Sequence, residues 1–466
     1  MESKQNASPD FCMEAPQPSS AGRRMGVLAL FIVSSAVAAI IGSFILHNNG
    51  AAMDYKMIYA GVRCFLAHRD PYQGSVMESA WVKIDGPLPI DPLTGHARHL
   101  CQFIYPPTIA TLVPFAELPW NLSHLAWIVT TILLLSLGGY CIWIESAAHA
   151  SDLSFLLIVV SLGTGPVFFV SANPAGVAIG LCLIAAWCFI REQFTWVGVF
   201  CMAASLAIKP HDGFLVWTCF LLVGGVLRRR ALQAFALTLV LCLPVIGWVW
   251  HSAPGWPVEL RANLAAITAP GELDDPRPQA SSDRTAGMMI NLQAGISLLD
   301  DDERIYNAVT VAICGSMMLF WAREILLDRH AAGHIWYALA AAAPMTMLLI
   351  YHRSYDAKLL LIGLPACARL WNGRGARGWT ALLLGVFSIG LMNEVSLSML
   401  ASMTSALPVH QSGLNRNTLL AVLAHPAPFT LLAMSLFYLW VYREIRRAEA
   451  DTSITVIEPL SSATAG

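Results

Sequence analysis

Long apolar runs recur along the whole 466-residue chain and constrain its fold more than any other feature. A helix needs about 20 mostly apolar residues to cross a bilayer, and fewer where neighbouring helices bury it. We predict twelve such spans: Met25–Leu46, Leu122–Ile144, Leu153–Val170, Pro174–Ile190, Phe194–Ile208, Gly213–Leu227, Ala231–Trp250, Ile305–Trp321, Ile335–Ile350, Ala357–Ala368, Trp379–Met392 and Thr418–Tyr442. Hydrophobic residues form 56% of the chain and charged residues 12%, against about 25% charged in soluble domains. The pattern therefore predicts an all-α, polytopic membrane protein.

The distribution of Lys and Arg predicts how these spans are oriented, because cytoplasmic loops carry an excess of positive charge. With the N-terminus in the cytoplasm, fifteen of the 28 Lys and Arg residues fall in inner segments. The short outer connections then carry four: Lys209, Arg353, Lys358 and Arg416. We therefore predict an inner-membrane protein with both termini in the cytoplasm. Its parts would be tails at 1–24 and 443–466, one membrane domain at 25–442, and extracytoplasmic loops at 47–121 and 251–304.

Charge and cysteine usage exclude some classes of function. A net charge of −2 gives no reason to expect a nucleic-acid partner. The eleven cysteines are scattered without a CxxC pair, so no zinc site and no cofactor is predicted. Cys64 and Cys101 share the first long loop and could form a disulfide if that loop is extracytoplasmic.

Asp54 is the candidate catalytic residue, about eight residues beyond the end of the first predicted span. A carboxylate in a partly dehydrated site has a raised affinity for protons and can act as a general base. The alternative is an ordinary solvated loop residue, which describes most aspartates in such positions. The choice between the two depends on the residues that surround Asp54.

Several cations stand at the predicted outer ends of spans, where they could bind a phosphate: Lys209, His211, His352, Arg353 and Lys358. Charges at the membrane edge are costly to insert and therefore often functional, although a Lys or Arg there can also extend to the interface without a site role. Asp356 is close enough in sequence to orient His352 or Arg353. Arg261 could lie on an interfacial helix beside the site, or that helix could simply pack there.

Other acidic residues are better explained by local structure. The run Asp300–Glu303 precedes a predicted helix, whose N-terminal dipole favours negative charge. Asp70 precedes Pro71 and is expected to form a turn. The pair Asp274–Asp275 lies beside Gly and Pro residues and is predicted to be solvated.

A set of short motifs resembles glycosyltransferase family 87. They are Asp54 with Tyr59-Ala60-Gly61 and Asp70-Pro71-Tyr72, then Tyr105-Pro106-Pro107, Lys209-Pro210 and Tyr351-His352-Arg353-Ser354-Tyr355-Asp356. The resemblance runs in order from about residue 25 to residue 442. It implies a GT-C fold and transfer of a hexose, such as mannose, from a polyprenyl-phosphate donor to a glycolipid or polysaccharide.

The resemblance also implies roles for individual residues. Asp54 matches the catalytic base, and His352 matches a histidine that lines the same cavity, with Tyr105 as a further substrate contact. Relatives often carry Gly-Gln or Asn-Gln after the third span, whereas this chain has Asn173-Pro174, which puts the identity of donor or acceptor in doubt. No metal is assigned. A twelve-helix transporter or lipid flippase is the main alternative, and a ligase or acyltransferase that uses the same lipid carriers is another.

Overall fold

The computed structural model describes residues 21–45, 53–85, 102–270, 272, 274–277, 289–393, 396, 399 and 425–455, and these are folded as helices and their connections. The α-helices are α1 (Ala21–Ile45), α2 (Met53–Leu66), α3 (Gly74–Asp85), α4 (Val113–Ala116), α5 (Trp120–Gly163), α6 (Pro166–Ser171), α7 (Ala175–Ile190), α8 (Thr195–Ile208), α9 (Pro210–Val223), α10 (Gly225–Ser252), α11 (Trp256–Ile267), α12 (Leu292–Ser297), α13 (Glu303–Leu327), α14 (Ile335–Leu349), α15 (Leu364–Asn372), α16 (Ala376–Leu391) and α19 (Pro426–Thr455). Two 3-10 helices are η1 (Pro107–Leu112) and η3 (Ser354–Gly363). The all-α prediction is confirmed for these residues.

Four of the described helices, α1, α5, α10 and α13, are long and apolar enough to cross a membrane. Their outer faces carry large exposed apolar side chains, such as Phe44 (78% exposed), Val240 (66%) and Leu319 (75%). Exposed apolar side chains of this size and number would be costly to hydrate and suit contact with lipid. Six shorter apolar helical segments accompany the long helices. The chain is therefore described as a membrane protein with several spanning helices.

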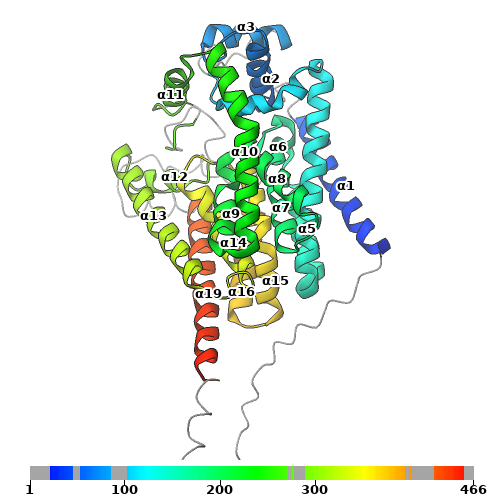
Figure 1. Ribbon diagram of the computed structural model, residues 1–466, viewed down its shortest axis with the longest axis vertical. Coiled ribbons are helices and arrows are strands. Elements are labelled where there is room, and N and C mark those ends of the chain that lie inside the picture. The colour runs from blue at the N-terminus through cyan, green and yellow to red at the C-terminus, as the bar shows by residue number, and fades with distance from the viewer. Residues whose placement is uncertain are drawn as a thin grey trace, which may run out of the picture.

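The centre of the bundle is formed by α7 and α14, which are buried on nearly all sides (Figure 1). A helix that is apolar around its whole circumference belongs inside a bundle or a membrane. Small residues let its neighbours approach: a Cβ atom on Gly180 would lie 2.7 Å from the backbone carbon of Leu134 in α5. Without a hydrophobic effect between lipid-facing helices, such close packing is a main source of association.

The second and third predicted spans are joined in α5, which has non-helical torsion angles at Ala150 (φ −156°, ψ 66°). The chain reverses there, since an added Cβ on Gly139 would lie 3.1 Å from Ile158 and since the indole of Trp143 donates to the Ser151 carbonyl at 3.3 Å. The two halves therefore pack against each other as a hairpin, which agrees with two separate spans.

Helices α2, α3, η1, α4 and α11 gather at one end of the bundle, and we call this group the cap (Figure 1). Buried hydrogen bonds join its parts. The Tyr59 hydroxyl donates to the Leu118 carbonyl at 2.9 Å, and the Asn263 amide of α11 donates to the Tyr72 carbonyl at 3.0 Å. Asp70 accepts from the Tyr72 amide at 2.9 Å, which confirms the predicted turn. The described parts of both long loops are thus folded.

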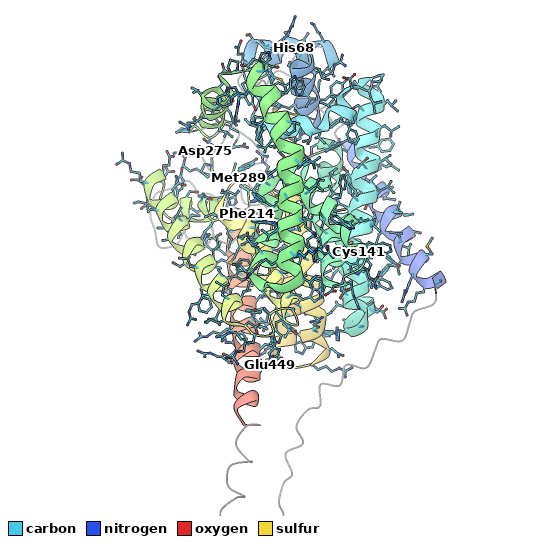
Figure 2. All side chains as sticks on the ribbon, in the orientation of Figure 1. His68, Cys141, Phe214, Asp275, Met289 and Glu449 are labelled. Carbon is cyan, nitrogen blue, oxygen red and sulfur yellow. The ribbon has the colours of Figure 1, made fainter. Side chains whose placement is uncertain are left out.

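The opposite end holds the end of α19 (Figures 1 and 2, where His68 marks the cap and Glu449 the far end). There the His334 imidazole lies between two carboxylates, 2.9 Å from Asp328 and 2.9 Å from Glu449. Arg446 donates twice to the buried Glu324 at 2.7 and 2.9 Å. These contacts fasten α19 to α13 and to the α13–α14 connection.

Two predicted spans need correction, and other predictions lie outside the described residues. The predicted span Leu153–Val170 is not one helix, because α5 ends at Gly163 and α6 begins at Pro166. The predicted span Ala357–Ala368 is not one α-helix, because η3 covers its first half and α15 begins at Leu364. Pro365 explains the break, since proline has no N–H to donate and its ring clashes with the carbonyl four residues earlier. Arg416 and residues 418–424 of the last predicted span lie outside the described residues. The Cys64–Cys101 pairing depends on Cys101, which also lies outside them.

Candidate active site

Three helix starts meet at the base of the cap. Asn173 precedes α7, Lys209 precedes α9 and Arg353 precedes η3. Asp54, in the first turn of α2, contacts Asn173, and residues of the α9 and η3 starts form ion pairs with each other. A helix start presents unpaired N–H groups and the positive end of the dipole. This convergence suits the binding of a negatively charged group.

The carboxylate of Asp54 is half-buried and held in a fixed orientation. The Asn173 side-chain amide donates to Asp54 Oδ2 at 2.8 Å, while its own oxygen accepts from the Ala175 amide at 2.9 Å. Burial raises the pKa of Asp54 above its usual value near 3.8, and the Asn173 hydrogen bond together with Arg353 and Lys209 opposes that rise. The acid therefore combines solvent contact with a strengthened affinity for protons, as a general base requires.

Arg353 is fixed by the second long loop. Its guanidinium donates to Asp274 at 2.9 Å and to the Tyr351 hydroxyl, and its backbone pairs with Met289. Asp274 is 5% exposed and Asp275 is 1% exposed, so the prediction that this pair is solvated was wrong. Arg277, which donates to Asp275 from its Nε (2.9 Å), gives that second carboxylate a partly buried partner. Local sequence could not reveal the contact between Arg353 and Asp274, which are 79 residues apart.

Asp356 organises the neighbouring ion pairs. It is 2% exposed and accepts from Lys209 Nζ, from His352 Nδ1 at 2.9 Å and from the Arg353 backbone amide at 3.1 Å. Burial disfavours its charge, yet Lys209 and His352 hold the pKa of Asp356 below its usual range. Asp356 thus stays ionised and orients three groups, which agrees with the orienting role expected from the sequence.

We call Lys209, His211, Asp212, His352 and Asp356 the ionic cluster. Lys209 Nζ lies 3.4 Å from Asp212, and the rings of His211 and His352 meet edge to face with centroids 4.9 Å apart. Asp54 lies within electrostatic range of Lys209, which joins the cluster to the base of the cap.

Two tyrosine side chains lie near both Asp54 and the ionic cluster. Tyr105 is in electrostatic range of both Asp54 and Asp356, and the Tyr355 ring lies 5.5 Å from Lys209 Nζ. An aromatic face beside a cation is typical of sites that bind sugars or hold an ammonium group in place. The structure therefore places Tyr105 near Asp54 and Asp356, and Tyr355 beside Lys209.

Two of the predicted site residues lie elsewhere. Lys358 is buried and donates to the Ser161 carbonyl near the end of α5. Arg261 is exposed on α11, and it is Asn263 that ties this helix to the cap. The long loops place these side chains in ways that span patterns do not predict.

Sequence reasoning missed the roles of Asn173 and Asp212. Asn173 was noted as a departure from a family pattern, although a polar residue between two apolar segments already signals a special position. Asp212 follows His211 directly, yet it is 1% exposed and faces His352 from a distant segment. A single sequence does not reveal which helix starts will meet.

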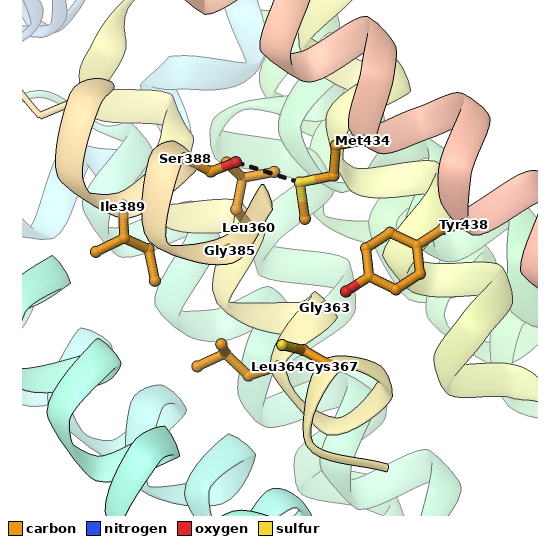
Figure 3. Close-up of a pocket in the computed structure, with 9 residues that line it drawn as sticks. All are labelled: Leu360, Gly363, Leu364, Cys367, Gly385, Ser388, Ile389, Met434 and Tyr438. Atoms are coloured by element: carbon orange, nitrogen blue, oxygen red, sulfur yellow. Dashed lines mark hydrogen bonds between the residues drawn. The ribbon is translucent and has the colours of Figure 1, made fainter. Parts of the chain in front are cut away.

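A small pocket between η3, α15, α16 and α19 is separate from this site (Figure 3). Its lining is almost entirely apolar, apart from the Ser388 hydroxyl, which lies 3.4 Å from the Met434 sulfur, and the Tyr438 ring. No member of the ionic cluster lines it. The lining residues carry no charged side chain for phosphate binding.

Comparison of the chain with protein-family models finds no match, and a search of curated proteins also finds no similar sequence. The site must therefore be interpreted from its own geometry.

Proposed function

We propose that this chain is an inverting membrane glycosyltransferase. It would move a hexose, such as mannose, from a polyprenyl-phosphate sugar to a glycolipid or polysaccharide acceptor on the extracytoplasmic side. The GT-C-like fold, the twelve spans and the cytoplasmic termini belong to this proposal. In that orientation the cap and the starts of α7, α9 and η3 all lie toward the outer leaflet.

One observation carries the proposal: the half-buried Asp54 carboxylate is oriented by Asn173 and lies in electrostatic range of Arg353 and Lys209. A base and two cations are the groups that transfer from a lipid phosphate needs. The sugar phosphate already has a good leaving group, so the protein must accept a proton and stabilise the departing charge.

The proposed reaction is a single displacement. Asp54 accepts the proton of the acceptor hydroxyl while that oxygen attacks the anomeric carbon of the sugar. The bond between this carbon and the phosphate oxygen breaks, and the phosphate leaves with the electron pair. Lys209, Arg353 and the helix starts offset its charge. Attack from the face opposite the phosphate converts a β-linked donor into an α-linked product, and this scheme requires no metal.

Both cations have carboxylate partners, which sets their affinity for phosphate. Lys209 pairs with Asp356 and Arg353 with Asp274, so a phosphate must share these donors with the acids. The acids also keep both side chains in place, so little order is lost when substrate binds. Asp356 and Asp274 are therefore positioning residues in this proposal.

The test replaces Asp54 by Asn, which keeps the shape and the hydrogen bond with Asn173 possible but removes the base. Membranes containing the protein are incubated with a radiolabelled polyprenyl-phosphate hexose, and label in the acceptor fraction is measured. Asp70→Asn is the matched control, because Asp70 also lies in the first loop and its amide oxygen can still accept from Tyr72.

We expect Asp54→Asn to lower transfer by at least about 100-fold, the lower range for loss of a general base, with unchanged protein level. Asp70→Asn should retain transfer. Equal transfer by both variants would remove Asp54 from the mechanism. Uptake of a solute into vesicles that contain no lipid-linked sugar would instead support the transporter alternative.

A further inference from the structure

His352 has a buried nitrogen with no hydrogen-bond partner among the described residues. Its side chain is 0% exposed, and its Nδ1 lies 2.9 Å from Asp356 Oδ2. Because the carboxylate is an acceptor, Nδ1 carries the proton and Nε2 presents a lone pair. Nε2 is buried and unpaired. A carboxylate that fixes the tautomer of an imidazole in this way is typical of histidines that bind metal ions.

Asp212 presents one of its oxygens to two imidazoles. Its Oδ2 faces Lys209 Nζ at 3.4 Å, whereas its Oδ1 lies 3.8 Å from His211 Nε2 and 3.6 Å from His352 Nδ1. The side chain is 1% exposed, and neither oxygen makes a hydrogen bond with the described residues. Burying a carboxylate without hydrogen bonds costs desolvation free energy, so a positively charged partner beside Asp212 Oδ1 would be stabilising.

The charges around Asp212 also favour a bound cation. Asp356 carries the shorter ion pair with Lys209 and also accepts from His352. Within the ionic cluster, two carboxylates therefore face one permanent cation, and one negative charge remains when both imidazoles are neutral. A cation between Oδ1 and the two rings would remove that excess and give this oxygen of Asp212 a positive partner.

We propose that His211, Asp212 and His352 form a binding site for a divalent transition-metal ion of the zinc class. One ligand atom from each side chain lies within 4.8 Å of the others. Two imidazoles and a carboxylate suit such ions better than Mg²⁺ or Ca²⁺, which prefer all-oxygen sites.

The three ligand atoms must move closer together to bind the ion. Ligand distances of about 2.0–2.2 Å in a tetrahedral Zn²⁺ site place the ligand atoms roughly 3.4 Å apart. The His211 side chain is 34% exposed and can move inward, whereas Asp212 and His352 are buried. Three protein ligands leave the fourth position of a tetrahedral ion open.

The binding inference stands apart from the proposed reaction, which requires no metal. If the proposed function holds, an ion in this place would add positive charge near Lys209, on the side where the donor phosphate would bind. That consequence rests on the proposed function, whereas the binding site rests on the three side chains alone. The experiment therefore measures metal binding without any sugar donor.

The full-length protein is purified in detergent through a tag without histidine, treated with a chelator and dialysed against Zn²⁺. Bound metal per chain is measured by mass spectrometry, and affinity by competition with a chromogenic chelator. Co²⁺ replaces Zn²⁺ in a parallel sample, where visible absorption reports nitrogen and oxygen ligands. The variants are His211→Ala and Asp212→Asn, with His251→Ala as control, because His251 is exposed at the end of α10.

We expect one Zn²⁺ per chain in the unaltered protein and in His251→Ala. His211→Ala should weaken binding by more than about 100-fold, because loss of an outer-shell partner alone costs about 10–100-fold. His211 is partly exposed, so this variant should elute from gel filtration as the unaltered protein does. The proposal is overturned if the unaltered protein retains less than stoichiometric metal, or if His211→Ala binds Zn²⁺ with the same affinity.

Discussion

Removing either partner of the ion pair between Lys209 and Asp356 should destabilise the protein. The Lys209 side chain is 12% exposed and that of Asp356 is 2% exposed, so solvent screens the pair weakly. Removing one partner of a buried pair leaves an uncompensated charge and costs about 3–5 kcal/mol. Asp356→Asn removes the charge with little change in shape, and Lys209→Met removes the other charge while keeping the apolar stem.

The free energy of unfolding of both single variants and of the double variant forms a thermodynamic cycle. Each single change should cost about 3–5 kcal/mol, whereas the double variant leaves neither of the two charges alone. We therefore expect the double variant to lose at least about 2 kcal/mol less than the sum of the singles, a coupling within the range for residues in contact. Unfolding is followed by tryptophan fluorescence in mixed micelles as the denaturing detergent increases.

An exposed pair provides the control for this cycle. Arg23 and Asp152 are 3.3 Å apart with side chains 57% and 96% exposed. Such pairs contribute less than about 1 kcal/mol, so Arg23→Met and Asp152→Asn should change stability little. A coupling below about 0.5 kcal/mol between Lys209 and Asp356 would refute the argument that they form a buried, mutually dependent pair.

Two further predictions concern pH. Because burial raises the pKa of Asp54, transfer activity should fall on acidification at a pH above 3.8, the usual pKa of this group. Asn173→Ala removes a hydrogen bond that lowers the pKa of Asp54, so this variant should move the acid limb of the activity profile to higher pH. An acid limb that stays in place in Asn173→Ala would show that Asp54 does not set it. Burial opposes the charge of His334, but Asp328 and Glu449 raise its pKa above 6.5. The stabilisation of α19 by charged His334 should be complete below pH 6.5 and lost as pH rises through the raised pKa. Proteolysis at the end of α19 should therefore accelerate as pH rises. A similar acceleration in His334→Gln would contradict the role of His334.

Much of the helical framework could be predicted from the sequence, because apolar runs report burial in lipid directly. The run Leu122–Ile144 lies in the first half of α5, whereas its successor Leu153–Val170 is broken where α5 ends at Gly163 and α6 begins at Pro166. Asp302 caps α13 by accepting from the Arg304 amide at 2.8 Å, as the acidic run indicated. The predicted span at Ala357–Ala368 failed because an apolar composition does not distinguish an α-helix from the 3-10 helix that precedes Pro365.

The candidate site was only partly predictable. Asp54, Lys209, His352 and Arg353 share the property of standing near the ends of apolar runs, so they could be selected one by one. Their partners could not, since the Asn173–Asp54 and Lys209–Asp356 contacts join positions 119 and 147 residues apart. Such contacts depend on which helix starts meet, and this is decided by packing across the whole bundle.

The account's central claim is that a lipid-phosphate sugar binds where Asp54 faces Arg353 and Lys209. The most direct measurement is photocrosslinking with a polyprenyl-phosphate hexose that carries a diazirine on the sugar, because it needs no knowledge of the acceptor. The claim predicts labelled peptides that contain Asp54, Tyr105 or Arg353, with labelling suppressed by unlabelled donor. Suppressible labelling confined to other segments, or none at these peptides, would contradict it.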